Sequence, residues 1–255
     1  MISVIIIAKN QADLLVDCLK SAQWAREIIV VDNGSTDNTV AVAQKYNAKV
    51  YKGPQGSFSD WRNFGASLAK GDWIFYLDVD ERITPDLKAE IQTLLQHWNE
   101  SPINPVAYAV PRKNNLLGHD MRFGGWWPDY VLRLINKKFL IGWKGDLHEQ
   151  PKIKGAVGKL KNSIYHISHR SLTEMMDKTN SWSEIEAKLL FKSGHPPMAW
   201  WRFFSVATRE FFYRGVWKLG FFDGPIGAIE VFYQVYSRMI TYAKLWEMQE
   251  MGKKK

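Results

Sequence analysis

The chain has 255 residues, which is enough for one large domain or two small ones with a substantial hydrophobic core. Hydrophobic residues make up 46% of it and charged residues 24%, so disorder and fibrous structure are excluded. The 34 basic residues outnumber the 26 acidic ones, which leaves a net charge of +8, and 14% of all residues are aromatic. This composition favours polyanionic partners such as nucleotides, nucleic acid or an anionic membrane surface.

Other features bear on the cellular compartment. The single cysteine, Cys18, cannot form an internal disulfide, so nothing indicates an oxidising environment. An apolar stretch begins at Ser3 with no basic region before it, and we therefore expect no cleaved signal peptide. No apolar run reaches the roughly 18 residues that a spanning helix needs. We predict a cytoplasmic protein.

The first hundred residues alternate between predicted strands and helices. β-Branched and apolar runs predict strands at residues 3–8, 27–31, 48–51 and 72–77. Apolar periodicity and capping residues predict helices at residues 11–22, 38–46, 61–69 and 85–98. This alternation predicts an α/β fold, in which a mostly parallel, Rossmann-like sheet carries helices on both faces.

The remainder of the chain is less regular. Short strands are predicted at residues 106–111, 131–135 and 163–167. The capping box from Ser171 to Glu174 predicts a helix that runs to about residue 191. The last 58 residues contain 15 of the 35 aromatic residues, so we predict a separate C-terminal helical extension that is rich in aromatic side chains.

Two acidic clusters follow predicted strands. Asp32 ends the second strand, and Asp78 and Asp80 follow the fourth. Ligands of parallel α/β sheets bind at the carboxyl ends of the strands. Two carboxylates separated by one residue can hold a hard cation that also binds substrate phosphates. A solvated turn is the plainer alternative, but the second acidic strand end favours a ligand site.

These segments resemble glycosyltransferase family 2. The segments that carry the resemblance are residues 3–10, 29–37 and 71–81, in this order and spacing. The resemblance implies a GT-A fold, a nucleotide-sugar donor, a divalent metal (Mg²⁺ or Mn²⁺) and inversion at the anomeric centre. It also implies that Asp32 and Asn33 contact the nucleobase or ribose, and that Arg62 contacts the nucleotide. Asp78 and Asp80 would bind the metal and the pyrophosphate.

Two later segments narrow the resemblance. Residues 124–134 and 145–149 are similar to the branch that adds sugars to the inner core of lipopolysaccharide. This similarity implies a UDP-sugar donor, with glucose favoured and heptose or galactose left open. It also implies a lipid-linked glycan acceptor at the cytoplasmic face of the inner membrane. Another cell-envelope polysaccharide remains an alternative acceptor.

Inverting transfer needs a base that takes the proton of the acceptor hydroxyl. We predict that Glu149 is this base, with Asp146 in reserve, and that His148 lies beside the diphosphate or the metal. His166 and His169 alternate on a predicted strand, and we interpret both as structural.

The predicted acceptor-binding residues are Trp126, Trp127 and Asp129. The two tryptophans fit stacking on a sugar face or packing in a core equally well. We therefore predict three parts of the chain. Residues 1–100 form the donor-binding half of the GT-A domain, residues 101–170 its acceptor-binding half, and residues 171–255 the helical extension.

The extension contains two amphipathic patterns. Trp200, Phe204, Ala207 and Phe211 form one stripe, and Ile229, Phe232, Tyr236, Met239, Ala243 and Trp246 form the other. We predict that the first helix lies on an anionic membrane surface, helped by neighbouring basic residues. For the second helix the pattern favours packing on the catalytic domain.

Three other functions fit the sequence less well. A nucleotidyltransferase needs a glycine-rich loop after the first strand, and residues 8–11 contain no glycine. A non-catalytic sugar-nucleotide-binding protein at the membrane has no need of the Asp78–Asp80 pair. Nucleic-acid binding requires a dense basic stripe, and the chain has none before its last three lysines.

Overall fold

The computed structural model describes residues 1–98, 104–145 and 149–253. The chain divides into two compact units. The first comprises Met1–Lys113 and Asp129–His166, and the second comprises Asn114–Pro128 and Ile167–Lys255. The second unit therefore includes residues 114–128, which the sequence placed in the acceptor-binding half. The functional names of the three predicted parts stay predictions.

The first unit is built on a mixed sheet. Its strands are β1 (Ile2–Ala8), β2 (Glu27–Asp32), β3 (Lys49–Lys52), β4 (Trp73–Tyr76), β5 (Glu81–Ile83), β6 (Ala107–Leu116), β8 (Asp129–Asn136), β11 (Val157–Lys159) and β12 (Ile164–His169). Along the sheet the order is β3-β2-β1-β4-β8-β6-β12-β5, with β11 paired to β6. The first four strands of this order are parallel, whereas β8 is antiparallel to both β4 and β6.

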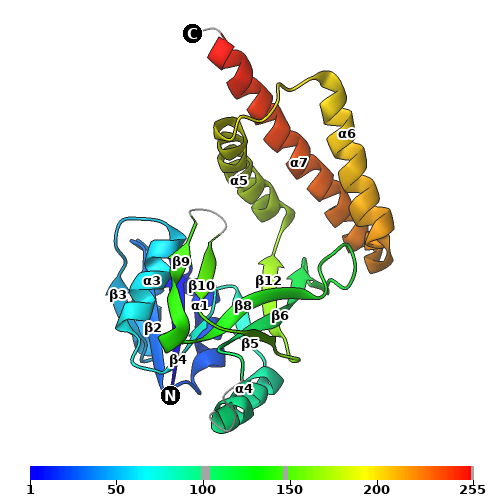
Figure 1. Cartoon of the computed structure of the whole chain (residues 1–255). Coiled ribbons are helices and arrows are strands. Elements are labelled where there is room, and N and C mark those ends of the chain that lie inside the picture. The colour runs from blue at the N-terminus through cyan, green and yellow to red at the C-terminus, as the bar shows by residue number, and fades with distance from the viewer. Residues whose placement is uncertain (99–103, 146–148, 254–255) are drawn as a thin grey trace. The chain divides into compact units, whose positions relative to one another are not determined.

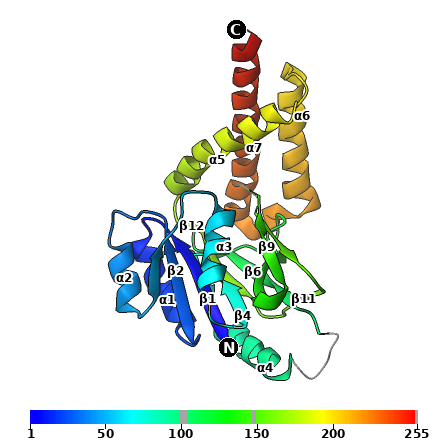
Figure 2. The same cartoon turned by 60° about the vertical axis from the view of Figure 1, so that its left-hand side comes forward.

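Four helices flank this sheet. They are α1 (Ala12–Ala22), α2 (Thr39–Lys45), α3 (Phe58–Leu68) and α4 (Pro85–His97) (Figures 1 and 2). Alternate residues of β1 point to opposite faces: Val4 and Ile6 pack in a core with α1, α2 and α4, while Ile5 packs in a second core with α3. Gly65 allows α3 to approach closely, because a Cβ there would lie 2.6 Å from Ile5 Cγ2. The predicted α/β class, with helices on both faces of the sheet, is confirmed.

Capping residues explain where two helices begin. Thr84 accepts a hydrogen bond from the Leu87 amide and Pro85 occupies the first turn of α4, as the sequence predicts. The helix α3 begins at Phe58, three residues before the predicted start. Ser57 and Asp60 form a capping box there, which the sequence analysis missed.

A hairpin that the sequence did not predict lies beside α3. It consists of β9 (Leu140–Lys144) and β10 (Gln150–Ile153), which follow the short 3₁₀ helix η2 (Lys137–Phe139). Asn63 of α3 accepts a hydrogen bond from the Trp143 amide at 2.8 Å and donates one to the Trp143 carbonyl at 3.1 Å. These bonds fix the hairpin, and with it Glu149, next to α3.

The second unit is mainly helical. It contains β7 (His119–Asp120), α5 (Leu172–Lys192), α6 (Trp200–Phe211), the π-helical turn η3 (Phe212–Trp217), the 3₁₀ turn η4 (Gly220–Asp223) and α7 (Gly224–Lys253). Both α5 and α6 pack against α7 (Figure 2). The Asp223 carboxylate accepts hydrogen bonds from the Arg122 and Phe123 amides and lies 3.3 Å from His119, which anchors residues 114–128 to the helices. Among the described helices, none is long and apolar enough to cross a membrane.

Glu27 links several elements at the amino end of the sheet. Its carboxylate accepts hydrogen bonds from Ser3 Oγ at 2.7 Å, from the Lys70 amide at 2.9 Å and from Lys49 Nζ at 2.7 Å. Burial alone would raise the pKa of Glu27, but the bonds from Lys49, Lys70 and Ser3 outweigh burial and hold the pKa below its ordinary value. The ionised carboxylate therefore stabilises the folded state.

We expect Glu27→Gln to lower the free energy of unfolding at neutral pH by about 1–3 kcal/mol, because Lys49 loses its charged partner. The folded-state pKa of Glu27 is depressed, so its contribution is complete above the unfolded-state value, near 4.5, and is lost as the pH falls through the lower folded-state value. Urea unfolding at a series of pH values should show that the difference in unfolding free energy between variant and wild type shrinks as the pH falls below about 4.5. Asp17→Asn removes an exposed carboxylate and is the control. If Glu27→Gln and Asp17→Asn lowered the unfolding free energy equally, the stabilising role of the Glu27 carboxylate would be contradicted.

Candidate active site

Asp32 and Asp78 lie at the ends of two strands on opposite sides of β1, at the point where the strand order of the sheet reverses direction. Strands β2 and β4 both pair in parallel with β1, one on each side of it. Asp32 ends β2, and Asp78 lies two residues beyond the end of β4. Crevices at such reversal points are where open α/β sheets bind ligands. The fold thus brings the two predicted clusters to the same edge.

Asp78 lies between two arginines. Arg62 Nη2 of α3 donates to Asp78 Oδ1 at 3.0 Å, and Arg133 Nη2 of β8 donates to Asp78 Oδ2. Removal from bulk water would raise the pKa of Asp78, but the guanidinium groups of Arg133 and Arg62 outweigh it and hold the pKa well below its ordinary value. Asp78 is therefore ionised, and both of its oxygens are engaged by arginine.

Arg133 and Glu81 extend this cluster into the protein. Arg133 is only 5% exposed and Glu81 is fully buried, and Arg133 Nη2 donates to Glu81 Oε1 at 2.6 Å. Glu81 Oε2 accepts from the Asp78 amide at 3.1 Å. Burial raises the pKa of Glu81, and the neighbouring Asp78 charge raises it further against the pull of Arg133. A buried guanidinium thus holds two carboxylates that sit three residues apart.

A pocket of about 570 Å³ opens beside this cluster. Its lining includes Arg62, Asp78, Arg112, Arg133, Trp143 and Glu149. Arg62 connects its two sides, because its guanidinium bonds Glu149 Oε1 at 3.2 and 3.3 Å as well as Asp78, and stacks 4.7 Å from the Trp143 ring. Glu149, the predicted base, and Asp78 are therefore brought to one pocket from positions 71 residues apart.

Asp129, predicted to bind the acceptor, lies in the same region. Its Oδ2 accepts from Arg112 Nε at 2.9 Å and from Arg112 Nη2 at 2.6 Å. Arg112 also lies 3.8 Å from Glu81. The pair of Arg112 and Asp129 therefore continues the alternation of arginines and carboxylates along the site.

Asp80 has a different environment from Asp78. Its carboxylate is about one-third exposed, and His166 Nε2 of β12 lies 3.5 Å from Asp80 Oδ2. The two side chains are close enough to share one cation, and carboxylate oxygen with imidazole nitrogen is a suitable donor set for Mn²⁺. Each oxygen of Asp78 already accepts a hydrogen bond from an arginine, Oδ1 from Arg62 and Oδ2 from Arg133.

The charge balance of the site also fits a cation. The carboxyl groups of Asp78, Glu81, Asp129 and Glu149 lie against three guanidinium groups, those of Arg62, Arg112 and Arg133, and Asp80 lies against His166. Carboxyl groups therefore outnumber guanidinium groups in this cluster. A divalent ion would neutralise this excess and allow a diphosphate to approach.

The other predicted donor contacts are placed at the end of β2. The Asp32 carboxylate, only 7% exposed, accepts the amides of Gly34 and Ser35, each at 3.2 Å. Asn33 is partly exposed, and its backbone N–H donates a hydrogen bond to the Ala8 carbonyl at 2.9 Å. Asp32 therefore shapes the turn after β2, and contact between Asp32 or Asn33 and a nucleotide stays a prediction.

The two predicted tryptophans belong to the second unit. Trp126 packs in the core of the second unit with Leu116, Met121 and Met175, whereas Trp127 is 44% exposed. His148 and Asp146 lie outside the described residues.

Sequence reasoning missed Arg133, Glu81, Arg112 and His166. Arg133 interrupts an apolar run from Val131 to Ile135, and a charged residue on a buried strand needs a buried partner. That signal was available for Arg133. The sequence contains no comparable signal for His166, which we interpreted as structural but which lies against Asp80.

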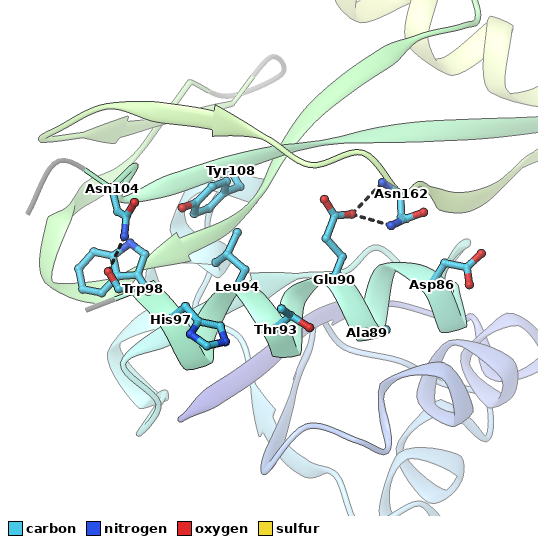
Figure 3. Close-up of a pocket in the computed structure, with 10 residues that line it drawn as sticks. All are labelled: Asp86, Ala89, Glu90, Thr93, Leu94, His97, Trp98, Asn104, Tyr108 and Asn162. Carbon is cyan, nitrogen blue, oxygen red and sulfur yellow. Dashed lines mark hydrogen bonds between the residues drawn. The ribbon is translucent and has the colours of Figure 1, made fainter. Parts of the chain in front are cut away.

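A second pocket, of about 720 Å³, lies along α4 and is not a candidate for this chemistry (Figure 3). Its polar groups serve the fold, since Glu90 accepts the Lys161 and Asn162 amides and Trp98 Nε1 donates to the Pro105 carbonyl. Trp98 packs on Trp73, the first residue of β4, so this pocket lies toward the amino end of the strands. Ligands of parallel α/β sheets bind at the opposite end.

Comparison with known proteins defines the class. The model of the family described as glycosyl transferase family 2 matches residues 3–149. An uncharacterized glycosyltransferase of Rickettsia bellii is 30% identical over 97% of this chain and 86% of its own length. The chain belongs to glycosyltransferase family 2, and the matched region contains Asp32, Asp78, Asp80 and Glu149.

Two further comparisons are informative. The lipopolysaccharide core biosynthesis glycosyltransferase LpsC of Rhizobium meliloti is 26% identical over 96% of this chain and 92% of its own length. The crystal structure of a mycobacterial protein superimposes with a TM-score of 0.50 at 15% identity, covering 77% of this chain and 75% of the other, which is a similarity of fold alone.

The position of Arg133 leads to a stability prediction. We expect Arg133→Met to lower the free energy of unfolding by about 3–5 kcal/mol, because Asp78 and Glu81 lose their shared buried cation. Arg133→Lys should recover only part of this loss, since an ammonium cannot reproduce the guanidinium fork. Urea denaturation measures both changes. Arg26→Met, at an exposed arginine, should change stability by less than about 0.5 kcal/mol. A similarly small effect of Arg133→Met would show that the cluster does not stabilise the fold.

Proposed function

We propose that this glycosyltransferase transfers a sugar, with inversion, from a UDP-sugar to a lipid-linked glycan acceptor such as the inner core of lipopolysaccharide. Glucose is the favoured sugar. The observation that carries the proposal is the single pocket that contains both Asp78, at the strand end where family 2 enzymes are expected to bind the donor, and the candidate base Glu149. Similarity to LpsC, a lipopolysaccharide core glycosyltransferase, supports the acceptor class.

The proposed reaction is a displacement at the anomeric carbon. Glu149 accepts the proton of the acceptor hydroxyl as its oxygen forms a bond to that carbon. The bond between the anomeric carbon and the diphosphate oxygen breaks on the opposite side, and UDP leaves with the bonding electrons. Arg62 orients Glu149 by its two hydrogen bonds, and the same guanidinium reaches the strand end where the diphosphate would lie.

We propose that Asp80 and His166 hold the divalent cation, Mg²⁺ or Mn²⁺, with His148 as a further candidate. When bound, the cation would neutralise charge on the leaving diphosphate. Asp78, which the sequence predicted as a second ligand, would instead keep Arg62 and Arg133 in place at the donor phosphates. The excess of carboxyl groups in the cluster and the 3.5 Å approach of His166 to Asp80 support this assignment.

For the acceptor side we propose Asp129, held by Arg112, together with Trp126 and Trp127. The exposed ring of Trp127 is available for stacking on a sugar, whereas the core packing of Trp126 supports a role in positioning its neighbour. Asp32 and Asn33 stay the proposed contacts to the nucleoside. Synthesis would take place on the cytoplasmic face of the inner membrane.

We expect Glu149→Gln to lower the turnover number by about 10²–10⁴-fold while the affinity for UDP stays nearly unchanged, because the amide cannot accept the proton. Release of UDP from a panel of nucleotide sugars, with and without Mn²⁺ and acceptor, measures turnover and tests the proposed function itself. Asp129→Asn is the comparison variant and should raise the acceptor KM more than it lowers the turnover number. Normal turnover with weakened UDP binding in Glu149→Gln would place this residue in the donor site instead.

The cation site has a binding test that needs no acceptor. We expect Asp80→Asn and His166→Asn each to weaken Mn²⁺-dependent binding of UDP by at least about tenfold, because each removes one protein ligand. Titration calorimetry of UDP with and without Mn²⁺ measures the change. His97→Asn, at an exposed histidine on α4, is the control and should bind as the wild type does. If His166→Asn also binds normally, Asp80 holds the cation without it.

A further inference from the structure

The second unit exposes an unusual number of large aromatic rings. We define the aromatic surface by six side chains, with their exposed fractions: Trp200 (75%), Phe204 (67%), Phe212 (59%), Trp217 (79%), Phe222 (73%) and Phe232 (59%). They belong to α6, η3, η4 and the first turns of α7. Single exposed apolar residues are ordinary, but a concentration of this kind in one helical hairpin marks an interaction surface.

Two rings of this surface, Phe212 and Phe232, contact the Phe211 ring. The Phe211 ring lies 5.6 Å from the rings of Phe212 and Phe221 and 5.9 Å from the ring of Phe232. The Trp200 and Phe204 rings pack against each other at 6.1 Å, one turn apart on the same helix. Phe212 and Phe232 are thus linked through Phe211, and Trp200 and Phe204 form a second ring pair on α6.

The charges beside these rings have one sign at the surface. Between residues 196 and 225 the acidic side chains are Glu210 and Asp223, and both are buried. Glu210 is bonded to Arg214 at 2.5 Å, and Asp223 accepts backbone amides. Arg202, Arg209 and Lys218 form no ion pair within the described chain, so the exposed charge of this segment is cationic.

Two of these cations lie against aromatic rings. The Arg202 guanidinium stacks 4.7 Å from the Trp201 ring, and Lys218 Nζ lies 5.7 Å from the Tyr213 ring. Arg202 Nε is buried and has no hydrogen-bond partner among the described residues. Aromatic rings with adjacent basic groups are the composition of surfaces that sit at the level of lipid headgroups.

The helix α7 extends the apolar surface. Its buried face, which includes Val231, Thr241 and Leu245, packs within the unit. On its opposite side, Ile229, Phe232, Tyr236, Met239 and Trp246 are between 36% and 59% exposed. The predicted stripe on this helix is therefore not part of the core of the second unit.

We propose that the aromatic surface docks on an anionic lipid bilayer, with its rings at the boundary between headgroups and acyl chains and with Arg202, Arg209 and Lys218 at lipid phosphates. A helix rich in aromatic residues with basic flanks binds in this way through buried apolar area and attraction to anionic lipid. The cationic charge favours a bilayer over a second copy of the chain, which would bring like charges together. This proposal concerns where the enzyme binds, and it stands whether or not the sugar and acceptor are assigned correctly.

Flotation with phosphatidylcholine vesicles of rising phosphatidylglycerol content tests the proposal on the full-length protein. We expect binding to rise with the anionic lipid content and to weaken with salt. The double variant Trp217→Ser/Phe222→Ser should bind at least about tenfold more weakly, because two largely exposed rings are removed from the contact with the bilayer. Trp182→Ser, on α5 and 44% exposed, is the matched control and should bind as the wild type does.

A charge variant separates the electrostatic part of the proposal. Arg209→Glu should lower binding to anionic vesicles about fivefold or more but leave binding to neutral vesicles unchanged, whereas Lys192→Glu on α5 should change neither. Circular dichroism and UDP binding should be the same for all variants, which separates this test from that of the catalytic site. Absence of flotation at low salt would overturn the proposal. If the wild type self-associates in sedimentation, and the Trp217→Ser/Phe222→Ser variant loses this self-association but floats as the wild type does, the surface binds a second copy of the chain instead.

Discussion

The candidate site depends on one interaction, the insertion of the Arg133 guanidinium between Asp78 and Glu81. A charge on a central strand is tolerated only when a partner of opposite sign lies within hydrogen-bonding distance. Arg133 meets this requirement on β8, and it fixes the segment after β4 that carries Asp78 and Asp80. The arrangement connects the stability of the sheet to the geometry of the candidate site, since the same bonds serve both.

The remaining features of the site follow from how this cluster is completed. Arg62 reaches it from α3 and Glu149 from the start of β10, and the Asn63 bonds to Trp143 keep these two elements together. Carboxylates remain in excess, which a divalent ion would correct. The polar groups of the site are thus oriented by their hydrogen bonds to one another. Such preorganisation is a main source of catalytic power in enzymes that stabilise a charged leaving group.

The second unit differs from the first in how many large apolar side chains it exposes. Its helices bury Ala187, Met198 and Leu245 in a small core, and yet α6, η3 and α7 keep several of the largest rings of the chain in solvent. Leaving such rings exposed is unfavourable in water, and this is the physical basis of the proposed contact with a bilayer. Acidic side chains in the segment are buried and paired, which leaves the outer surface basic.

The sequence by itself determined the features that depend on neighbouring residues. Four of the five strands and all four helices of the first hundred residues, the cap at Thr84, the acidic ends at Asp32 and Asp78, and membership of family 2 follow from local periodicity and motif spacing. The sequence did not show that Arg133 bonds Asp78, that His166 lies beside Asp80, or that residues 114–128 belong with the helices through Asp223. Those partners lie 55, 86 and about 100 residues apart along the chain. Only the order of strands in the sheet and the packing of α7 decide which distant charges meet, because a local pattern specifies which face a side chain occupies but not what lies opposite it.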